Sequence, residues 1–326
     1  MDFLWLHDLS TEFEGFGIAP TKSEIVAMRS SVSLLCERSH HDLVHFWGKI
    51  KGTERNYLIV ICYTGGLLGT RTPYASLDGV SWFGLPTVTQ TLISHVANIR
   101  EPIKGQPLSK ITVRHPRNTA PYKELNPLLP PKPVKEGEEE EEKVEEEEEQ
   151  KEEEPENEEE PEPEEEEEAP EYVEYEIHED QRLAVLVHII DKHGFIFPQD
   201  SLLWKSTFQL KPNPLFKSIP RDAKLENFFR FDKEIISDTQ RPNAIVDAMP
   251  PLTAELPPNG WIVSTTTHSN VVKVNSRVWP GLVFICKGNK WGTVYFGDGK
   301  PNTDYLFAVE GLEKPEEIKS ARIVYN

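Results

Sequence analysis

Histidine and acidic side chains are the residues in this 326-residue chain whose spacing could support metal binding or hydrolysis. His40 and His41 are adjacent, so in a strand they would point to opposite faces and could not share an ion. His188 and His193 lie five positions apart around a helix end, with no further ligand at suitable spacing. Asp191 and His193 would need a Ser or Cys nucleophile from elsewhere in the fold. We therefore predict no metal, no cofactor and no catalytic residue.

A glycine-rich segment at 64–70, TGGLLGT, raises the question of a phosphate cradle. It lacks the Gly-Lys-Ser/Thr ending that would place a lysine and a metal-binding hydroxyl on phosphates. The chain also contains no GxSxG, HExxH or P-loop motif. We expect a loop at 64–70, and an enzyme ranks third among three functional hypotheses.

Negative charge is concentrated in the segment 136–171, which holds 25 Glu and two Lys. This segment carries −23, whereas the whole chain carries −20, so the remainder sums to +3. Its few apolar groups cannot offset chain entropy and its charges repel one another, so we expect disorder. Three scattered cysteines and the lack of an apolar run of about 20 residues predict a reducing intracellular compartment and no membrane span.

The fold class that the pattern predicts is α+β, with an antiparallel β-rich core, a few helices and the disordered insert. We expect 1–114 and 172–326 to form two parts of one domain, separated by a proline-rich linker and the acidic insert at 115–171. Helices are expected from Thr21 or Ser23 to 38–41, from Pro86 to Ile99, from Asp180 to Gly194 and briefly at 222–229. Strands are expected at 43–51, 57–63, 74–83 as a pair, 111–114, 172–177, 195–197, 201–210, 261–265 and 271–275, with a further edge strand at 323–325.

The strongest local signal is 277–297, RVWPGLVFICKGNKWGTVYFG, which predicts a β-hairpin turning at Gly288 and Asn289. Lys287 then faces Lys290, and the remaining register follows from that pair. It places Cys286 opposite Trp291, Phe284 opposite Thr293 and Leu282 opposite Tyr295 on one face, with Val283 opposite Val294 and Ile285 opposite Gly292 on the other. Both faces are apolar, so the hairpin is expected between two layers. Because Pro280 cannot donate to a ladder, the first strand should be an edge there or begin near Gly281.

Seven tryptophans raise the question of a stacking surface for carbohydrate or nucleic acid. Trp47, Trp279 and Trp291 lie in apolar strand contexts without a Lys/Arg cluster, which favours core positions and no nucleic-acid partner. The residues that we select as structural or interaction candidates are Trp47, Trp279, Pro280, Gly281, Phe284, Trp291 and Tyr295.

Several motifs are distributed along the chain outside the insert. They are HFWGKIKG at 45–52, SLDGVSW at 76–82 with Leu85-Pro86, DQRL at 180–183 with IDK at 190–192, WPGL at 279–282 and YFGDG at 295–299. With these motifs the chain resembles the radial spoke head protein 9 homologues of motile cilia. The Trp-Pro-Gly motif is also similar to the related spoke head proteins 4 and 6, which leaves the paralogue open.

This resemblance implies a non-catalytic subunit of the axonemal radial spoke head, needed for head assembly and for signalling from the central pair to dynein. It implies spoke head proteins 4 and 6, other spoke subunits and central pair projections as partners, in a stable complex that could hold two copies per spoke. The long glutamate insert departs from the shorter family members. An alternative from a different class is an acidic, chaperone-like binder of basic proteins, in which 136–171 would contact basic surfaces.

Overall fold

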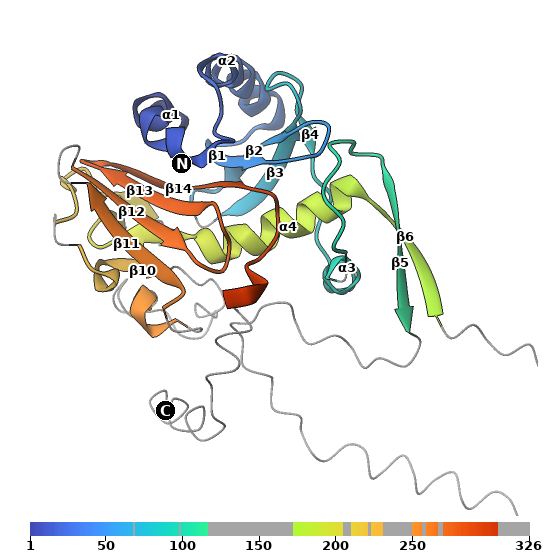
Figure 1. Cartoon of the computed structure of the whole chain (residues 1–326). Helices are drawn as coiled ribbons and strands as arrows, with labels where there is room; N and C mark the ends of the chain where they lie inside the picture. Colours follow the sequence, from blue (N-terminus) through green and yellow to red (C-terminus); the bar gives the residue numbers. More distant parts are fainter. Residues whose placement is uncertain are drawn as a thin grey trace, which may run out of the picture.

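An eight-stranded sheet forms the centre of the molecule (Figure 1). The computed structural model describes residues 1–67, 69–97, 99–116, 172–204, 210–220, 223–230, 250–255, 259–266 and 270–305. In spatial order the strands are β11 (Trp261–Thr266), β12 (Val271–Ser276), β13 (Leu282–Lys287), β14 (Lys290–Gly297), β1 (Leu43–Ile50), β2 (Tyr57–Thr64), β3 (Thr70–Ser76) and β4 (Phe83–Gly84). The predicted α+β class is confirmed. The acidic run 136–171, nearly all of the linker and the predicted strand at 323–325 lie outside the described residues.

The sheet is mixed, whereas the sequence predicted only antiparallel runs. Neighbouring strands pair antiparallel except β1 and β14, which run parallel with Gly48 opposite Tyr295. A tight turn forces its two strands to be antiparallel, but β1 and β14 come from opposite ends of the chain and no turn joins them. The parallel pair therefore joins the two antiparallel runs into one sheet.

The predicted hairpin is present as β13 and β14, with the predicted register. Lys287 faces Lys290 and Leu282 faces Tyr295. Gly288 has φ +62°, the left-handed conformation that the first turn position requires and that glycine adopts without strain. The first strand begins at Leu282, which agrees with the expectation that it starts near Gly281 because Pro280 cannot donate to a ladder.

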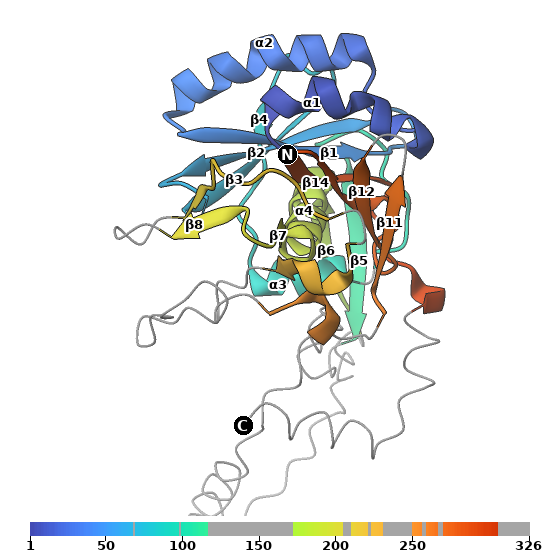
Figure 2. The same ribbon diagram turned by 90° about the vertical axis from the view of Figure 1, so that its left-hand side faces the viewer.

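Helices cover both faces of the sheet, which explains the two apolar faces of the hairpin. On one face lie α1 (Phe3–Leu9), the 3₁₀ helix η1 (Ser10–Phe16) and α2 (Lys22–Ser39), whereas α4 (Glu179–Gly194) lies on the other (Figures 1 and 2). Val283 and Ile285 belong to the core cluster beneath α1 and α2. Leu282 and Phe284 belong to the cluster beneath α4. The hairpin is thus the middle layer of three.

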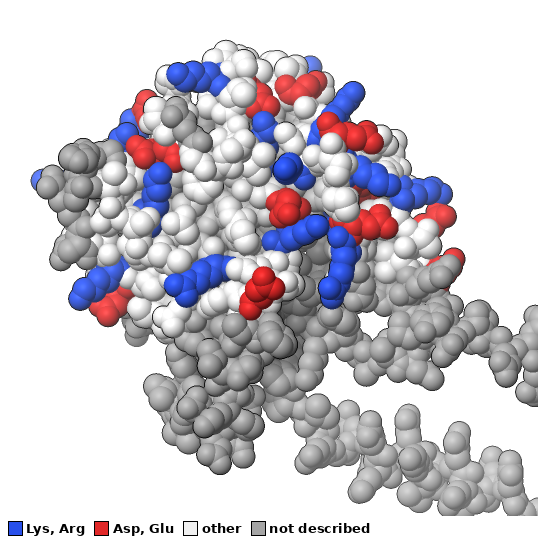
Figure 3. All heavy atoms as spheres, in the orientation of Figure 1, with Lys and Arg blue, Asp and Glu red and all other residues white. Residues whose placement is uncertain are grey.

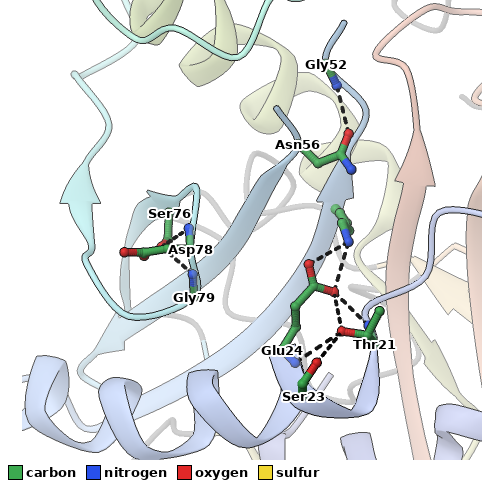
Figure 4. A network of polar contacts seen from close by, with 9 residues as sticks. Thr21, Ser23, Glu24, Gly52, Asn56, Ser76, Asp78 and Gly79 are labelled. Atoms are coloured by element: carbon green, nitrogen blue, oxygen red, sulfur yellow. Dashed lines mark hydrogen bonds and ion pairs between the residues drawn. The ribbon is translucent and has the colours of Figure 1, made fainter. Parts of the chain in front are cut away.

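The start of α2 shows how local sequence places a covering helix. Thr21 caps its first turn, and Glu24 accepts from the backbone N–H of Thr21 at 2.7 Å (Figure 4). The same Glu24 carboxylate accepts from Nζ of Lys49 in β1 at 2.8 Å. Burial alone would raise the pKa of Glu24, but the hydrogen bonds from Lys49 and Thr21 hold it below its usual value. One side chain therefore both begins the helix and ties it to the sheet.

A further layer lies on the side of α4 that faces away from the sheet (Figures 1 and 2). It contains α3 (Gln90–Val96) and the hairpin of β5 (Lys110–Pro116) with β6 (Tyr172–His178). The prediction that Pro86 opens the third helix was wrong, because the Thr89 hydroxyl accepts from the backbone N–H of Leu92 and the helix begins at Gln90. Val185 of α4 packs with Val113 and Ile177 of the hairpin.

Short elements after α4 complete the described fold. They are β7 (Ile196–Pro198), β8 (Leu202–Trp204), β9 (Leu210–Pro212), the 3₁₀ turns η2 (Leu225–Asn227) and η4 (Leu252–Ala254), and β10 (Phe228–Arg230). The prediction of one strand at 201–210 was wrong, because β8 and β9 pair with each other. Of the short helix predicted at 222–229, the described residues form only the 3₁₀ turn η2, because Phe228 pairs with Pro198 in a strand instead. None of the helices in the described part of the chain is long and apolar enough to cross a membrane.

Candidate functional site

The structure brings four of the predicted candidates together in the core beneath α4. Trp47, Trp279, Phe284 and Tyr295 are at most 7% exposed and belong to one cluster. The Trp47 and Tyr295 rings lie 5.3 Å apart, across the parallel strand pair. These residues pack the chain against itself, so none of them is exposed on the outer surface to a protein partner.

Trp291 occupies a different position, half-buried where three parts of the fold meet. Its ring centroid lies 6.2 Å from that of Trp5 in α1, 5.4 Å from that of Phe197 in β7 and 6.3 Å from that of Phe284 in β13. Aromatic pairs in this distance range contribute about 0.5–1.5 kcal/mol each beyond burial. Trp291 therefore links the N-terminal helix, the sheet and the short strands after α4.

The Trp279-Pro280-Gly281 segment forms the entry to β13. Trp279 donates its backbone N–H to the Ser276 hydroxyl at 3.1 Å and accepts from the backbone N–H of Leu282 at 3.0 Å. Gly281 has φ +92°, and a Cβ there would lie 2.0 Å from the carbonyl oxygen of Phe296. This motif thus requires glycine for two physical reasons, while Pro280 is exposed at the turn.

The Ser-His pairing that the sequence left open does occur, but its surroundings are wrong for catalysis. Nε2 of His193 lies 3.2 Å from the Ser276 hydroxyl, and the imidazole stacks on Trp261 with centroids 4.7 Å apart. Its Nδ1 lies 3.5 Å from Nη1 of Arg230, a cation where a triad has a carboxylate. Burial, helped by Arg230, lowers the pKa of His193 to about 3, so the ring is a poor general base. Asp191 pairs with Arg71 instead, at 2.5 Å.

The other chemical candidates are also separated or occupied. His40 ends α2 with φ +52°, and His41 bonds to the Thr64 hydroxyl and the Tyr74 hydroxyl at 2.9 and 3.2 Å. His188 is exposed on α4. Among the residues that the structure describes, no group of three or more His, Cys, Asp or Glu could hold a metal ion. The described part of 64–70 is the turn between β2 and β3, as predicted.

A buried carboxylate that sequence reasoning missed fixes the start of α4. Glu179 is 1% exposed and accepts four hydrogen bonds, at 2.7–2.9 Å. The donors are the Tyr57 hydroxyl of β2 and the backbone N–H groups of Lys104, Gly105 and Gln106. Its only sequence signal is a first-turn acidic residue, typical of any helix. Glu179 therefore connects the start of α4 to the sheet and to the loop that precedes β5.

The outer surface offers contacts of mixed character. On the face in Figure 3, Lys and Arg side chains alternate with Asp and Glu, and no large region carries a single sign. Large apolar side chains at least 38% exposed are also spread over several elements. They are Leu4, Val26, Leu34, Leu43, Val80, Leu108, Tyr175, Leu203, Leu215 and Ile262. This surface fits polar and apolar protein contacts better than the binding of a polyanion.

The polar clusters described above hold separate elements of the fold together. A family model for radial spokehead-like proteins matches residues 131–321, and the chain belongs to this family. It is 24% identical over 303 residues to the radial spoke head protein 9 homolog of Homo sapiens, covering 90% of this chain and 94% of that protein. The homologs of Bos taurus and Danio rerio are each 23% identical, over 303 and 301 residues. The resemblance stated from the sequence motifs is thereby confirmed.

Proposed function

We propose that this chain is a non-catalytic structural subunit of the radial spoke head, in the axoneme of a cilium or flagellum. The observation that carries this proposal is the family match together with relatives named radial spoke head protein 9 homolog that align over 90% of the chain. The buried, cation-facing His193 agrees with it, because the Ser-His pair has no usable base.

We propose further that 1–114 and 172–326 act as one spoke head domain, with 115–171 as a spacer. Support comes from the sheet, in which β1–β4 precede the spacer and β11–β14 follow it, joined by the parallel pair of β1 and β14. Trp47, Trp279 and Tyr295 would then maintain the fold, and the exposed apolar residues would contact partners. The run at 136–171, outside the described residues, would add weak charge-mediated contacts that reach about 8 Å at physiological salt.

The proposed role is assembly of the spoke head and transmission of signals from the central pair to dynein. The proposed partners are spoke head proteins 4 and 6 and other spoke subunits, held in a stable complex. A subunit under mechanical load needs extensive contacts that persist, and a three-layered interior tied by Glu179, Glu24 and Trp291 offers a firm support for them.

Affinity purification of the full chain from cells with motile cilia tests this role. We expect the spoke subunits to be recovered in constant proportion and to stay bound at about 0.3 M salt, because screening by salt does not weaken apolar contacts. A matched variant lacking 136–171 should recover the same subunits. Recovery of histones or ribosomal proteins that depends on 136–171 would instead favour the acidic chaperone hypothesis and contradict the proposed function.

A further inference from the structure

A cavity of about 380 Å³ lies between the sheet, the end of α4 and the short strands after it. This volume falls in the range of about 300–1,000 Å³ that is usual for small-molecule sites in proteins. Its wall is largely apolar and includes Trp47, Ile61, Phe197, Leu210, Leu282 and Trp291. Apart from Trp291, these side chains are at most 7% exposed. The cavity is therefore deep rather than a flat surface, which suits a compact molecule better than a protein face.

One polar side chain in the wall lacks a partner. Tyr63 is 4% exposed and lines the cavity, and no residue of the described part of the chain forms a hydrogen bond with its hydroxyl. Its ring contacts the imidazole of His45, with centroids 4.9 Å apart, and His45 lines the cavity as well. The Tyr63 hydroxyl keeps some accessible surface, unlike the fully buried unpartnered atoms of the described residues, so an oxygen of a molecule in the cavity can reach it as a hydrogen-bond acceptor.

The polar groups around Tyr63 carry almost no net charge. Burial raises the pKa of the Tyr63 phenol, with a further contribution from Asp191, so its hydroxyl keeps the proton and can donate. Burial lowers the pKa of His45, which leaves the imidazole neutral. The carboxylate of Asp191 is compensated by Arg71 at 2.5 Å. Asp2 and Lys211 also line the cavity and carry opposite charges, so a charged head group of either sign would lose its hydration and meet repulsion as well as attraction.

We propose that this cavity binds one small, uncharged amphiphile, with an apolar body against the aromatic wall and an oxygen acceptor at the Tyr63 hydroxyl. The depth, the volume and the unpartnered hydroxyl support a small molecule over a docked protein segment. This site is independent of the proposed assembly role, since its wall lies inside the fold.

The test uses the purified full chain and the fluorescent probe prodan, an uncharged naphthalene ketone that reports apolar surroundings by a blue shift. We expect saturable binding of one probe per chain, displaced by 1-decanol. Tyr63→Phe removes only the hydroxyl and should weaken prodan binding about fivefold, the effect of losing one hydrogen bond. Tyr74→Phe removes a hydroxyl that does not line the cavity and is the matched control, expected to bind as the parent does.

A second variant separates loss of the site from loss of the fold. Leu43→Trp enlarges a wall residue that is 42% exposed at the start of β1, so it should abolish prodan binding while the chain keeps its thermal unfolding transition. The proposal is overturned if prodan does not bind saturably, if Tyr63→Phe and Tyr74→Phe bind it equally, or if decanoate displaces it and 1-decanol does not. Displacement by an aromatic peptide alone would assign the cavity to a protein partner instead, and would also overturn the proposal.

Discussion

Gly48 and Tyr295 face each other across the parallel pair of β1 and β14, with no room for a side chain between them. A Cβ at Gly48 would lie 2.1 Å from the carbonyl oxygen of Tyr295. Backbone approach this close is one of the few reasons for glycine inside a strand. The contact joins residues 247 positions apart in the sequence.

Gly48→Ala should therefore destabilise the fold by about 3 kcal/mol, because the backbone of β14 must move away and break the parallel ladder. Urea unfolding of the full chain measures the change. Gly15→Ala is the matched control, since a Cβ at Gly15 has no neighbour within 4 Å. Equal midpoints for both variants would show that β1 and β14 do not pair as described.

Glu179→Gln should cost about 2–4 kcal/mol, although the two side chains have nearly the same shape. The amide has one acceptor oxygen instead of two, and its NH₂ group would face the donors that the carboxylate accepts from. Glu176→Gln is the control, because Glu176 makes only an exposed ion pair with Lys110. An unchanged urea midpoint for Glu179→Gln would mean that Glu179 is not buried among these donors.

The free energy of unfolding should decrease as the pH falls below about 6.5, because of His193. In the folded chain its pKa is about 3, whereas an exposed histidine takes up a proton below about 6.5. The unfolded state thus binds more protons as the pH falls from 6.5 to 3, and folding loses about 2 kcal/mol between pH 7 and pH 5 from this group. His193→Gln should lack this part of the pH dependence, which urea unfolding at both pH values measures. Parallel curves for the parent and His193→Gln would contradict a buried neutral imidazole.

Trp279→Ala should destabilise the fold by about 3–5 kcal/mol, the usual effect of emptying a packed aromatic site. Trp279 is 5% exposed in the core beneath α4. Leu215→Ala serves as the control because Leu215 is 82% exposed. A small, equal effect of both substitutions in urea would place Trp279 on the surface.

The local elements could be predicted because their signals are local. Gly288 determined the hairpin register, and Thr21 with the apolar stripe after it predicted α2. The pairing of β1 with β14 and the contacts of Glu179 could not be predicted, since each joins residues far apart in the sequence and depends on the complete fold. The short strands β8 and β9 were missed as a pair because three residues carry too little alternation to detect.

The candidate residues also divide into features that local sequence could predict and features that depend on the complete fold. Apolar context correctly indicated that Trp47 and Trp279 are buried, whereas Trp291, expected in the core on the same grounds, is only half-buried. Sequence context also could not show which exposed side chains a partner would cover. The unpartnered Tyr63 hydroxyl likewise has no sequence signal, because the apolar strand around it resembles any buried strand.

Electron tomography of axonemes from cells that lack this chain tests the proposed function most directly. The account predicts absent or misassembled spoke heads and impaired beating, because a structural subunit is removed. Cells carrying a chain without 136–171 should retain intact heads and show only a salt-dependent change in beating. Normal spoke heads and normal motility in cells without the whole chain would contradict the account.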